Sequence, residues 1–129
     1  MIYSVLCKVF GNNLSLPKKI FATTSFVVQE EGFVVIKTKE PWGKESYRID
    51  CENEYMKFIL LNERKLSKCG VTRIVLEYEM HYSLQCNGEI SSPKLLQQIS
   101  QLSLPVEVCI KAKEHVNEQA YEEWERLLA

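Results

Sequence analysis

The most regular pattern in the chain is a strict alternation of apolar and polar positions across residues 74–86. Even-numbered positions are apolar or aromatic, whereas Glu77, Glu79 and His81 occupy positions between them. Successive side chains of a β-strand point to opposite faces of a sheet, so a period of two predicts a strand. We therefore expect one long strand here, with one buried face and one wetter face.

Five shorter segments also have the composition of strands. Residues 2–10 are apolar at both odd and even positions, which predicts a central strand buried on both faces. Glu30, Glu31 and Gly32 separate two β-rich runs, and Gly32 can take the positive φ of a hairpin turn. The other strands expected are residues 25–29, 33–38, 46–49 and 106–111.

Helical spacing of apolar residues predicts four helices. The first three are expected to begin at a capping residue or at a proline in the first turn, where the missing N–H has no cost. The expected ranges are 15–22 (Ser15 cap, Pro17), 52–66 (Asp50 cap), a helix from Pro93 (Ser92 cap), and 116–128. The inward stripes expected are Tyr55, Phe58, Ile59 and Leu66; then Leu95, Leu96, Ile99 and Leu102; then Val116, Ala120, Trp124 and Leu127.

Two segments share one pattern. Residues 14–20 and 90–96 both read apolar-Ser-x-Pro-Lys-x-apolar, with their prolines 76 positions apart, and each lies between two expected strands. Either the chain contains two strand–helix–strand halves, or two common helix starts coincide. Both alternatives predict an α+β fold in a single domain spanning residues 1–129. The sheet is expected to be mixed and mostly antiparallel, with helices packed mainly on one face.

Composition narrows the class of protein. The chain has 129 residues, of which 46% are hydrophobic and 26% charged, as in globular domains. Sixteen basic and seventeen acidic residues give a net charge of -1, which argues against general nucleic-acid binding. The N-terminal residues do not resemble a signal peptide, and no apolar run is long enough for a membrane span. We expect a cytoplasmic protein with no nucleic-acid or membrane partner.

The motifs of common enzymes and cofactor sites are absent from the sequence. The five glycines form no phosphate-binding loop, and no G-x-S-x-G is present. The five cysteines (Cys7, Cys51, Cys69, Cys86 and Cys109) are too far apart for a C-x-x-C pair, which favours free thiols in a reducing compartment. A single catalytic cysteine beside His81 or His115 is the alternative. We expect no catalytic residue, no metal and no cofactor.

Six residues are candidates for binding a partner. Glu77, Glu79 and His81 share one face of the expected long strand, where they form a wet surface. A metal site there would need ligands from another element, because positions i to i+4 of a strand span about 13 Å. Trp42 lies in a Pro-Trp-Gly loop, where it either anchors a partner or folds back over the core. Glu30 and Glu31 form an acidic hairpin tip, and acidic residues also crowd positions 114–125, which could attract a basic partner.

The C-terminal part of the chain resembles a known protein family. The resemblance is carried by the alternating strand, the segment Ile90-Ser91-Ser92-Pro93-Lys94-Leu95-Leu96, the segment at residues 102–108, and an opening strand followed by a proline-started helix. The family consists of small bacterial cytosolic domains of unknown function, some of which are thought to be immunity proteins of secreted toxin systems. Cys109 and Lys111 depart from the acidic end of the last strand found in many members. The resemblance assigns no functional residue.

Three functions remain open at this stage. The first is a bacterial immunity protein that neutralises a toxin by stoichiometric binding and performs no catalysis. The second is a small enzyme or ligand-binding domain with a pocket between the sheet and the helices. The third is a structural module that forms oligomers by pairing the long strand or the last helix with a second copy, so that the protein is either a monomer or a homodimer.

Overall fold

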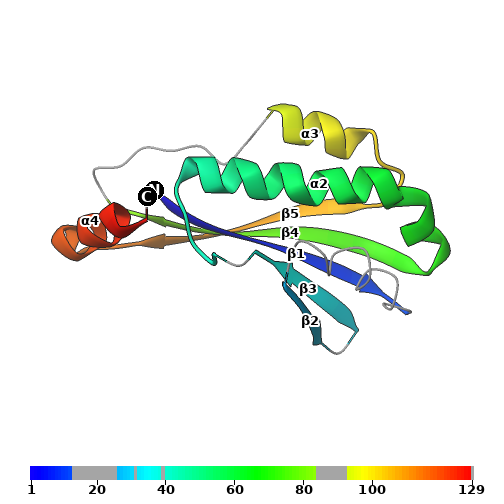
Figure 1. The fold of residues 1–129 in the computed structure, drawn as a ribbon, viewed down its shortest axis with the longest axis horizontal. Helices are drawn as coiled ribbons and strands as arrows, with labels where there is room; N and C mark the ends of the chain where they lie inside the picture. Colours follow the sequence, from blue (N-terminus) through cyan, green and yellow to red (C-terminus); the bar gives the residue numbers. More distant parts are fainter. Residues whose placement is uncertain (13–25, 31, 39, 84–92, 129) are drawn as a thin grey trace.

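The computed structural model describes residues 1–12, 26–30, 32–38, 40–83 and 93–128. Within them the chain forms an α+β fold, as the sequence predicts (Figure 1). In chain order the elements are β1 (Ile2–Gly11), β2 (Phe26–Glu30), β3 (Phe33–Lys37), α2 (Glu45–Lys68), β4 (Val71–Tyr82), α3 (Pro93–Ser100), β5 (Val106–Glu114) and α4 (Glu118–Leu127). The helix expected at residues 15–22 lies outside the described residues.

The strands form one mixed sheet in the order β2-β3-β1-β4-β5. Three of the pairings are antiparallel, and β5 pairs in parallel with β4. The predicted mostly antiparallel sheet is therefore confirmed, and β1 is the central strand. Because α3 connects β4 to the parallel strand β5, the second expected strand–helix–strand unit is present. In the first half, β3 lies between β1 and β2, so the two halves differ in strand order.

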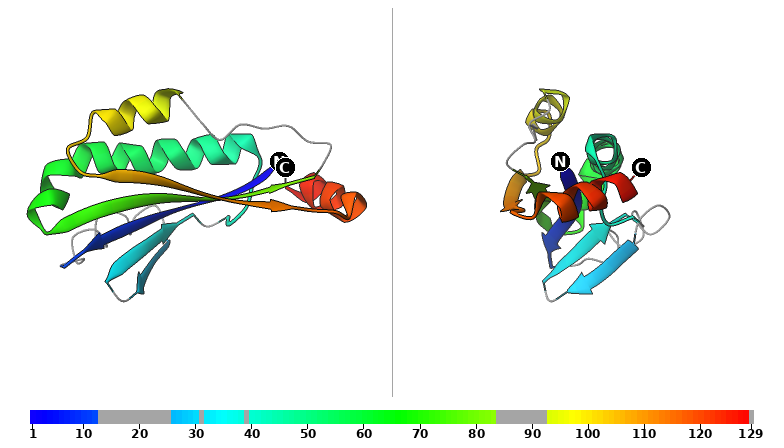
Figure 2. Two further views of the ribbon diagram at one scale, coloured as in Figure 1. Left: turned by 180° about the vertical axis from the view of Figure 1, so that it is seen from behind. Right: turned by 90° about the vertical axis from the view of Figure 1, so that its left-hand side faces the viewer.

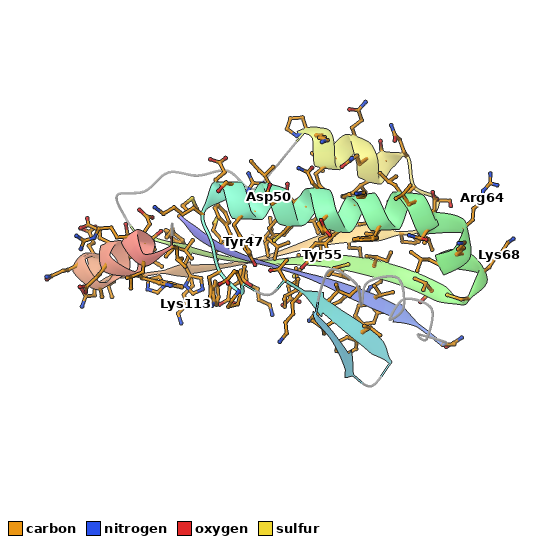
Figure 3. All side chains as sticks on the ribbon, in the orientation of Figure 1. Tyr47, Asp50, Tyr55, Arg64, Lys68 and Lys113 are labelled. Carbon is orange, nitrogen blue, oxygen red and sulfur yellow. The ribbon has the colours of Figure 1, made fainter. Side chains whose placement is uncertain are left out.

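One face of the sheet is sealed by α2, and we call it the covered face. It carries the odd-numbered residues of β1 and the even-numbered residues of β3 and β4, with side chains such as Val5, Ile36 and Leu76 fully buried. Tyr55 of α2 points into this face (Figure 3) and donates its hydroxyl hydrogen to the carbonyl oxygens of Val5, at 2.9 Å, and Ile36, at 3.3 Å. Burial of these apolar side chains is the main source of stability.

The opposite face carries the alternate residues of the same strands. Both α2 and α3 lie on the covered side, and α4 lies at one end of the sheet (Figures 1 and 2). The even-numbered residues of β1 from Ser4 to Phe10 are therefore half-buried, so the prediction that β1 is fully buried on both faces is wrong. We call this surface the open face: Ser4, Leu6, Lys8, Phe10, Phe33, Val35, Lys37, Arg73, Glu77, Glu79, Glu107, Cys109, Lys111 and Lys113.

Helix α2 begins seven residues earlier than the sequence predicts. Residues 46–49 are helical and not a strand, and Lys44 is the N-cap in place of Asp50. The buried stripe of the helix includes Arg48 and Glu52, two charged residues that form an ion pair. Their charge concealed the helical period, because a pattern search counts only apolar residues as inward-facing.

The inward face of α4 also differs from the prediction. Val116 and Leu127 are 85% and 80% exposed, and Ala120 is exposed as well. Asn117 is the N-cap and accepts a hydrogen bond from the Ala120 N–H at 3.1 Å, which sets the phase of the helix and turns Tyr121 and Trp124 inward. In α3, Leu95 is buried as expected, but Leu96 is exposed.

The longest described helix, α2, is too polar to cross a membrane, and none of the other described helices is long enough to do so. Its solvent side carries charged residues such as Arg64 and Lys68, which point away from the sheet (Figure 3).

Candidate functional site

Glu77 lies near the middle of the open face, between two lysines from neighbouring strands. Its carboxylate accepts from Lys8 Nζ of β1 at 2.7 Å and from Lys111 Nζ of β5 at 3.1 Å. The hydrogen bond from Lys8, together with the charges of both lysines, lowers the pKa of Glu77 below its ordinary value. The three side chains thus form a charged ladder across β1, β4 and β5.

Glu79 and His81, further along the same face of β4, begin a chain of hydrogen bonds. His81 Nε2 lies 3.0 Å from Glu79 Oε1, and His81 Nδ1 lies 2.6 Å from Nε2 of His115. Since a carboxylate can only accept, His81 donates through Nε2. One hydrogen then joins His81 Nδ1 to His115 Nε2, and it belongs to whichever of the two rings is protonated there.

His115 follows β5 and is half-buried beside His81 and Lys113. Burial, followed by the charges of His81 and Lys113, lowers the pKa of His115 below 6.5. The lowered pKa favours the neutral form of His115.

Aromatic rings surround the two imidazoles. The ring of His81 lies 4.9 Å from Trp42 and 5.2 Å from Trp124, both edge-on, and His115 lies 5.5 Å from Tyr121. We call this group the aromatic–histidine cluster: Trp42, His81, His115, Tyr121 and Trp124. It draws its members from the loop before α2, from β4, from the turn after β5 and from α4. Edge-on aromatic contacts of this kind stabilise a packed arrangement.

Backbone contacts hold the cluster in place. The N–H groups of Tyr3 and Gly43 each donate to the other residue's carbonyl, at 2.7 Å and 3.0 Å, and so fix the loop that carries Trp42. A side chain on residue 43 would collide with Tyr47, which accounts for glycine there. Helix α4 is tied to the sheet by the Tyr121 hydroxyl, which donates to the His81 carbonyl at 3.1 Å, and by the N-terminal ammonium of Met1, 3.1 Å from Glu125.

The structure brings four of the six candidate residues to one side of the sheet. Glu77 and Glu79 lie on the open face as expected. His81 projects from the same side of β4 but is buried, only 5% exposed, against Trp42 and Trp124, so the prediction of a wet surface is wrong at this residue. Glu30 ends β2 and pairs with Phe33, whereas residue 31 lies outside the described residues. Sequence reasoning considered His115 only as a possible partner of a catalytic cysteine. His115 lies four residues beyond the last expected strand, and no pattern in the sequence linked it to His81.

The arrangement does not resemble a common catalytic or metal centre. Among the described residues, no three His, Cys, Asp or Glu side chains converge on a point where they could hold an ion. His81 uses both ring nitrogens on Glu79 and His115, which leaves neither for a thiol. Cys7 is fully buried, and burial raises the pKa of its thiol to about 12; Cys109 is exposed on β5. Within this part of the chain the cluster is suited to holding a surface rigid.

A second feature is a cavity of about 250 Å³ between α2 and α3. At its base Arg48 Nη1 donates to Glu52 Oε1 at 2.6 Å, and the Tyr78 hydroxyl donates to the same oxygen at 2.7 Å. Its remaining lining is mixed polar and apolar: Ile49, Asn53, Pro93, Lys94, Leu95 and Gln98. The pocket expected between sheet and helices is thus located between two helices.

Comparisons of the chain with protein-family models, with curated proteins and with solved structures find no match. Function must therefore be argued from the residues of the open face, the aromatic–histidine cluster and the cavity.

Proposed function

We propose that this protein is a non-catalytic binding domain that neutralises a bacterial toxin in the cytoplasm by forming a one-to-one complex. The observation that carries the proposal is the open face, a broad sheet surface with charged side chains held at fixed positions. A toxin whose active-site entrance is seated on this face would be blocked without any chemistry by the inhibitor.

The charge of the open face indicates the chemistry of the partner. Among the described side chains of the open face, five are basic and three are acidic, although the whole chain has a net charge of -1. The basic residues are Lys8, Lys37, Arg73, Lys111 and Lys113, and the acidic residues are Glu77, Glu79 and Glu107. A partner surface rich in carboxylates fits this face, because complementary charge accelerates encounter and selects partners. The acidic residues that could attract a basic partner lie mostly on α4.

Rigidity supports the same proposal. Glu77 is held by two lysines, and Arg73 lies 3.4 Å from Glu107 and over the ring of Phe10. Phe10 and Phe33 stack with their ring centres 5.1 Å apart. Side chains that are already fixed lose little conformational entropy on binding, so such a surface suits tight association.

The test uses the product of a neighbouring toxin gene. Mixing the two purified proteins is expected to give a one-to-one complex by light scattering and to abolish the toxin's activity. Reversing two charges of the open face, with Lys37→Glu and Lys113→Glu together, should weaken binding at least about tenfold. The matched control is Lys57→Glu with Lys65→Glu, two exposed lysines of α2, and this variant should bind as the wild type does.

Two results would contradict the proposal. One is the absence of a complex with any neighbouring gene product. The other is equal weakening by the open-face and α2 variants, which would show that only net charge matters.

A second candidate function is binding of a small anion in the cavity between α2 and α3. Arg48 and Lys94 line this cavity, and the Arg48 side chain is almost fully buried there. Titration of the protein with inorganic phosphate, followed by amide chemical shifts, is expected to move the signals of Asn53 and Gln98 first. A Lys94→Glu variant should abolish that response, and uniform small shifts over the whole surface would rule this function out.

A further inference from the structure

Strand β5 forms an edge of the sheet, with β4 on one side and no described strand on the other. Each of its residues except the first is exposed. Val108 and Ile110 are 39% and 50% exposed and lie on the covered-face side of the strand. An exposed edge with apolar side chains is a template for pairing with another strand.

Hydrogen bonds to β4 show which backbone groups of β5 are available. Pro105 accepts from the Ile74 N–H at 3.0 Å, and the His115 N–H donates to the Tyr82 carbonyl at 2.8 Å. In a regular ladder the residues between these two alternate, so odd-numbered residues of β5 direct their N–H and C=O groups to β4. Even-numbered residues, including Val108 and Ile110, therefore direct these groups outward.

The sequence of β5 is complementary to itself when it is reversed about Cys109. An antiparallel pairing centred there places Val108 opposite Ile110 and Val106 opposite Ala112 of the second strand. It also places Glu107 opposite Lys111, twice in the symmetric pair. Within residues 106–112 every apolar residue faces an apolar residue and every charge faces its opposite, whereas Lys113 and Glu114 face Pro105 and Leu104, which precede the second strand.

We propose that β5 pairs with β5 of a second copy of this chain, which joins the two sheets edge to edge about a two-fold axis at Cys109. This inference rests on the backbone edge of β5 and needs no toxin, although Glu107, Cys109 and Lys111 also belong to the open face. The outward hydrogen-bonding residues are even-numbered, so Cys109 faces its counterpart as a non-hydrogen-bonded pair, the closer of the two antiparallel geometries.

Neighbouring registers fit less well. Pairing centred on Lys111 places two lysines opposite each other, and pairing centred on Glu107 does the same with two glutamates; both are unfavourable. Pairing centred on Ile110 leaves Val106 opposite Glu114, an apolar side chain against a charge. The register centred on Cys109 is therefore the one we assign.

Charge reversal provides the decisive experiment. The wild type is expected to have twice the 15.0 kDa mass of one chain by light scattering at high concentration and to dissociate on dilution. Glu107→Lys alone and Lys111→Glu alone should each weaken the homodimer at least about tenfold, since each places like charges opposite each other twice.

Mixing these two variants should restore the dimer, because every lysine of one chain then faces a glutamate of the other. Matched reversals elsewhere, such as Lys57→Glu, should leave the dimer unchanged. A wild type that stays monomeric at a protein concentration of about 1 mM would overturn the proposal, because a Kd above that value corresponds to very weak association. A mixture that stays monomeric would overturn it as well.

Cross-linking tests the register directly. Opposed residues in a non-hydrogen-bonded pair have Cα atoms about 4.5 Å apart, within the range that a disulfide spans. Mild oxidation with diamide should give a covalent dimer that Cys109→Ser abolishes. A covalent dimer that persists in Cys109→Ser would refute the register. None of these measurements involves a toxin. The dimer tests can therefore fail while the proposed function stands, and the toxin-binding test can fail while the dimer stands.

Discussion

Leu76 and Glu77 are neighbours in β4 and belong to two different environments. Leu76 is fully buried on the covered face beneath α2, whereas Glu77 lies on the open face between Lys8 and Lys111. The same alternation separates Val5 from Leu6 and Tyr78 from Glu79. One face of the sheet thus holds most of the core, and the other is the face for which we propose binding.

The two faces therefore differ in how much a substitution is expected to change the stability of the fold. Removing a group from the covered face leaves a cavity or an unpaired charge that water cannot fill. Removing a group from the open face leaves a site that water and neighbouring side chains can fill, so stability changes little. Four predictions test this contrast.

The largest effect is expected for Leu76→Ala. Deleting a fully buried leucine side chain should lower the free energy of unfolding by about 4 kcal/mol, because the packed core collapses only partly around the space. The control is Leu61→Ala on the exposed side of α2, which should have almost no effect. Urea denaturation of both variants makes the comparison, and equal losses would contradict it.

The buried ion pair of the covered side comes next. Glu52→Gln leaves the buried Arg48 charge with only the exposed carboxylate of Glu45, 3.4 Å away, and should cost about 3 kcal/mol. The double variant Arg48→Met with Glu52→Leu removes both charges and should lose less than the single variant. Urea denaturation compares the two. A double variant less stable than Glu52→Gln would contradict the prediction, because it would show that the ion pair itself stabilises the fold.

The third prediction concerns pH, which separates the contributions of His115 and Glu77 to stability. The pKa of His115 is lower in the folded protein than its ordinary 6.5, so the unfolded state binds the proton more readily. Stability contributed by neutral His115 is therefore fully present above pH 6.5 and is lost as the pH falls through the lower, folded pKa. Glu77 behaves in the same way at lower pH, since its pKa is lowered from 4.5.

Unfolding free energies measured from pH 7.5 to pH 3 should accordingly fall in two steps. His115→Gln should remove the upper step and leave the lower one. Glu77→Gln should leave the upper step and reduce the lower one, to which Glu63 and Glu125 also contribute because their pKa values are lowered too. A profile in which His115→Gln still loses stability between pH 6.5 and 5 would show that another group is responsible.

The smallest effect is expected for Lys111→Ala, whose urea midpoint should equal that of the wild type. The lysine is exposed, and Lys8 still pairs with Glu77 in its absence. Denaturation at low protein concentration, where self-association does not contribute, is the appropriate measurement. A clear loss of stability would show that the Lys8–Glu77–Lys111 ladder contributes to the stability of the fold.

Local patterns predicted much of this fold. The alternation in β4, the Gly32 turn with φ of 81° and the start of α3 at Pro93 were each readable from a few adjacent residues. The errors occurred where a local pattern competed with a distant contact. Arg48 and Glu52 did not look like core residues, because their partner Tyr78 lies 26 or more positions away. In α4, which begins after the N-cap Asn117, Trp124 faces inward as expected, whereas Val116, Ala120 and Leu127 are exposed.

The sequence by itself determined which residues could form strands and helices and which side of β4 would be wet, because these depend on the spacing of side chains along one segment. Only the tertiary structure decided that His115 meets His81, that Trp42 packs on them, and that basic residues outnumber acidic ones on the open face. These depend on strand order and register, which bring together segments far apart in the chain. No local period encodes such contacts.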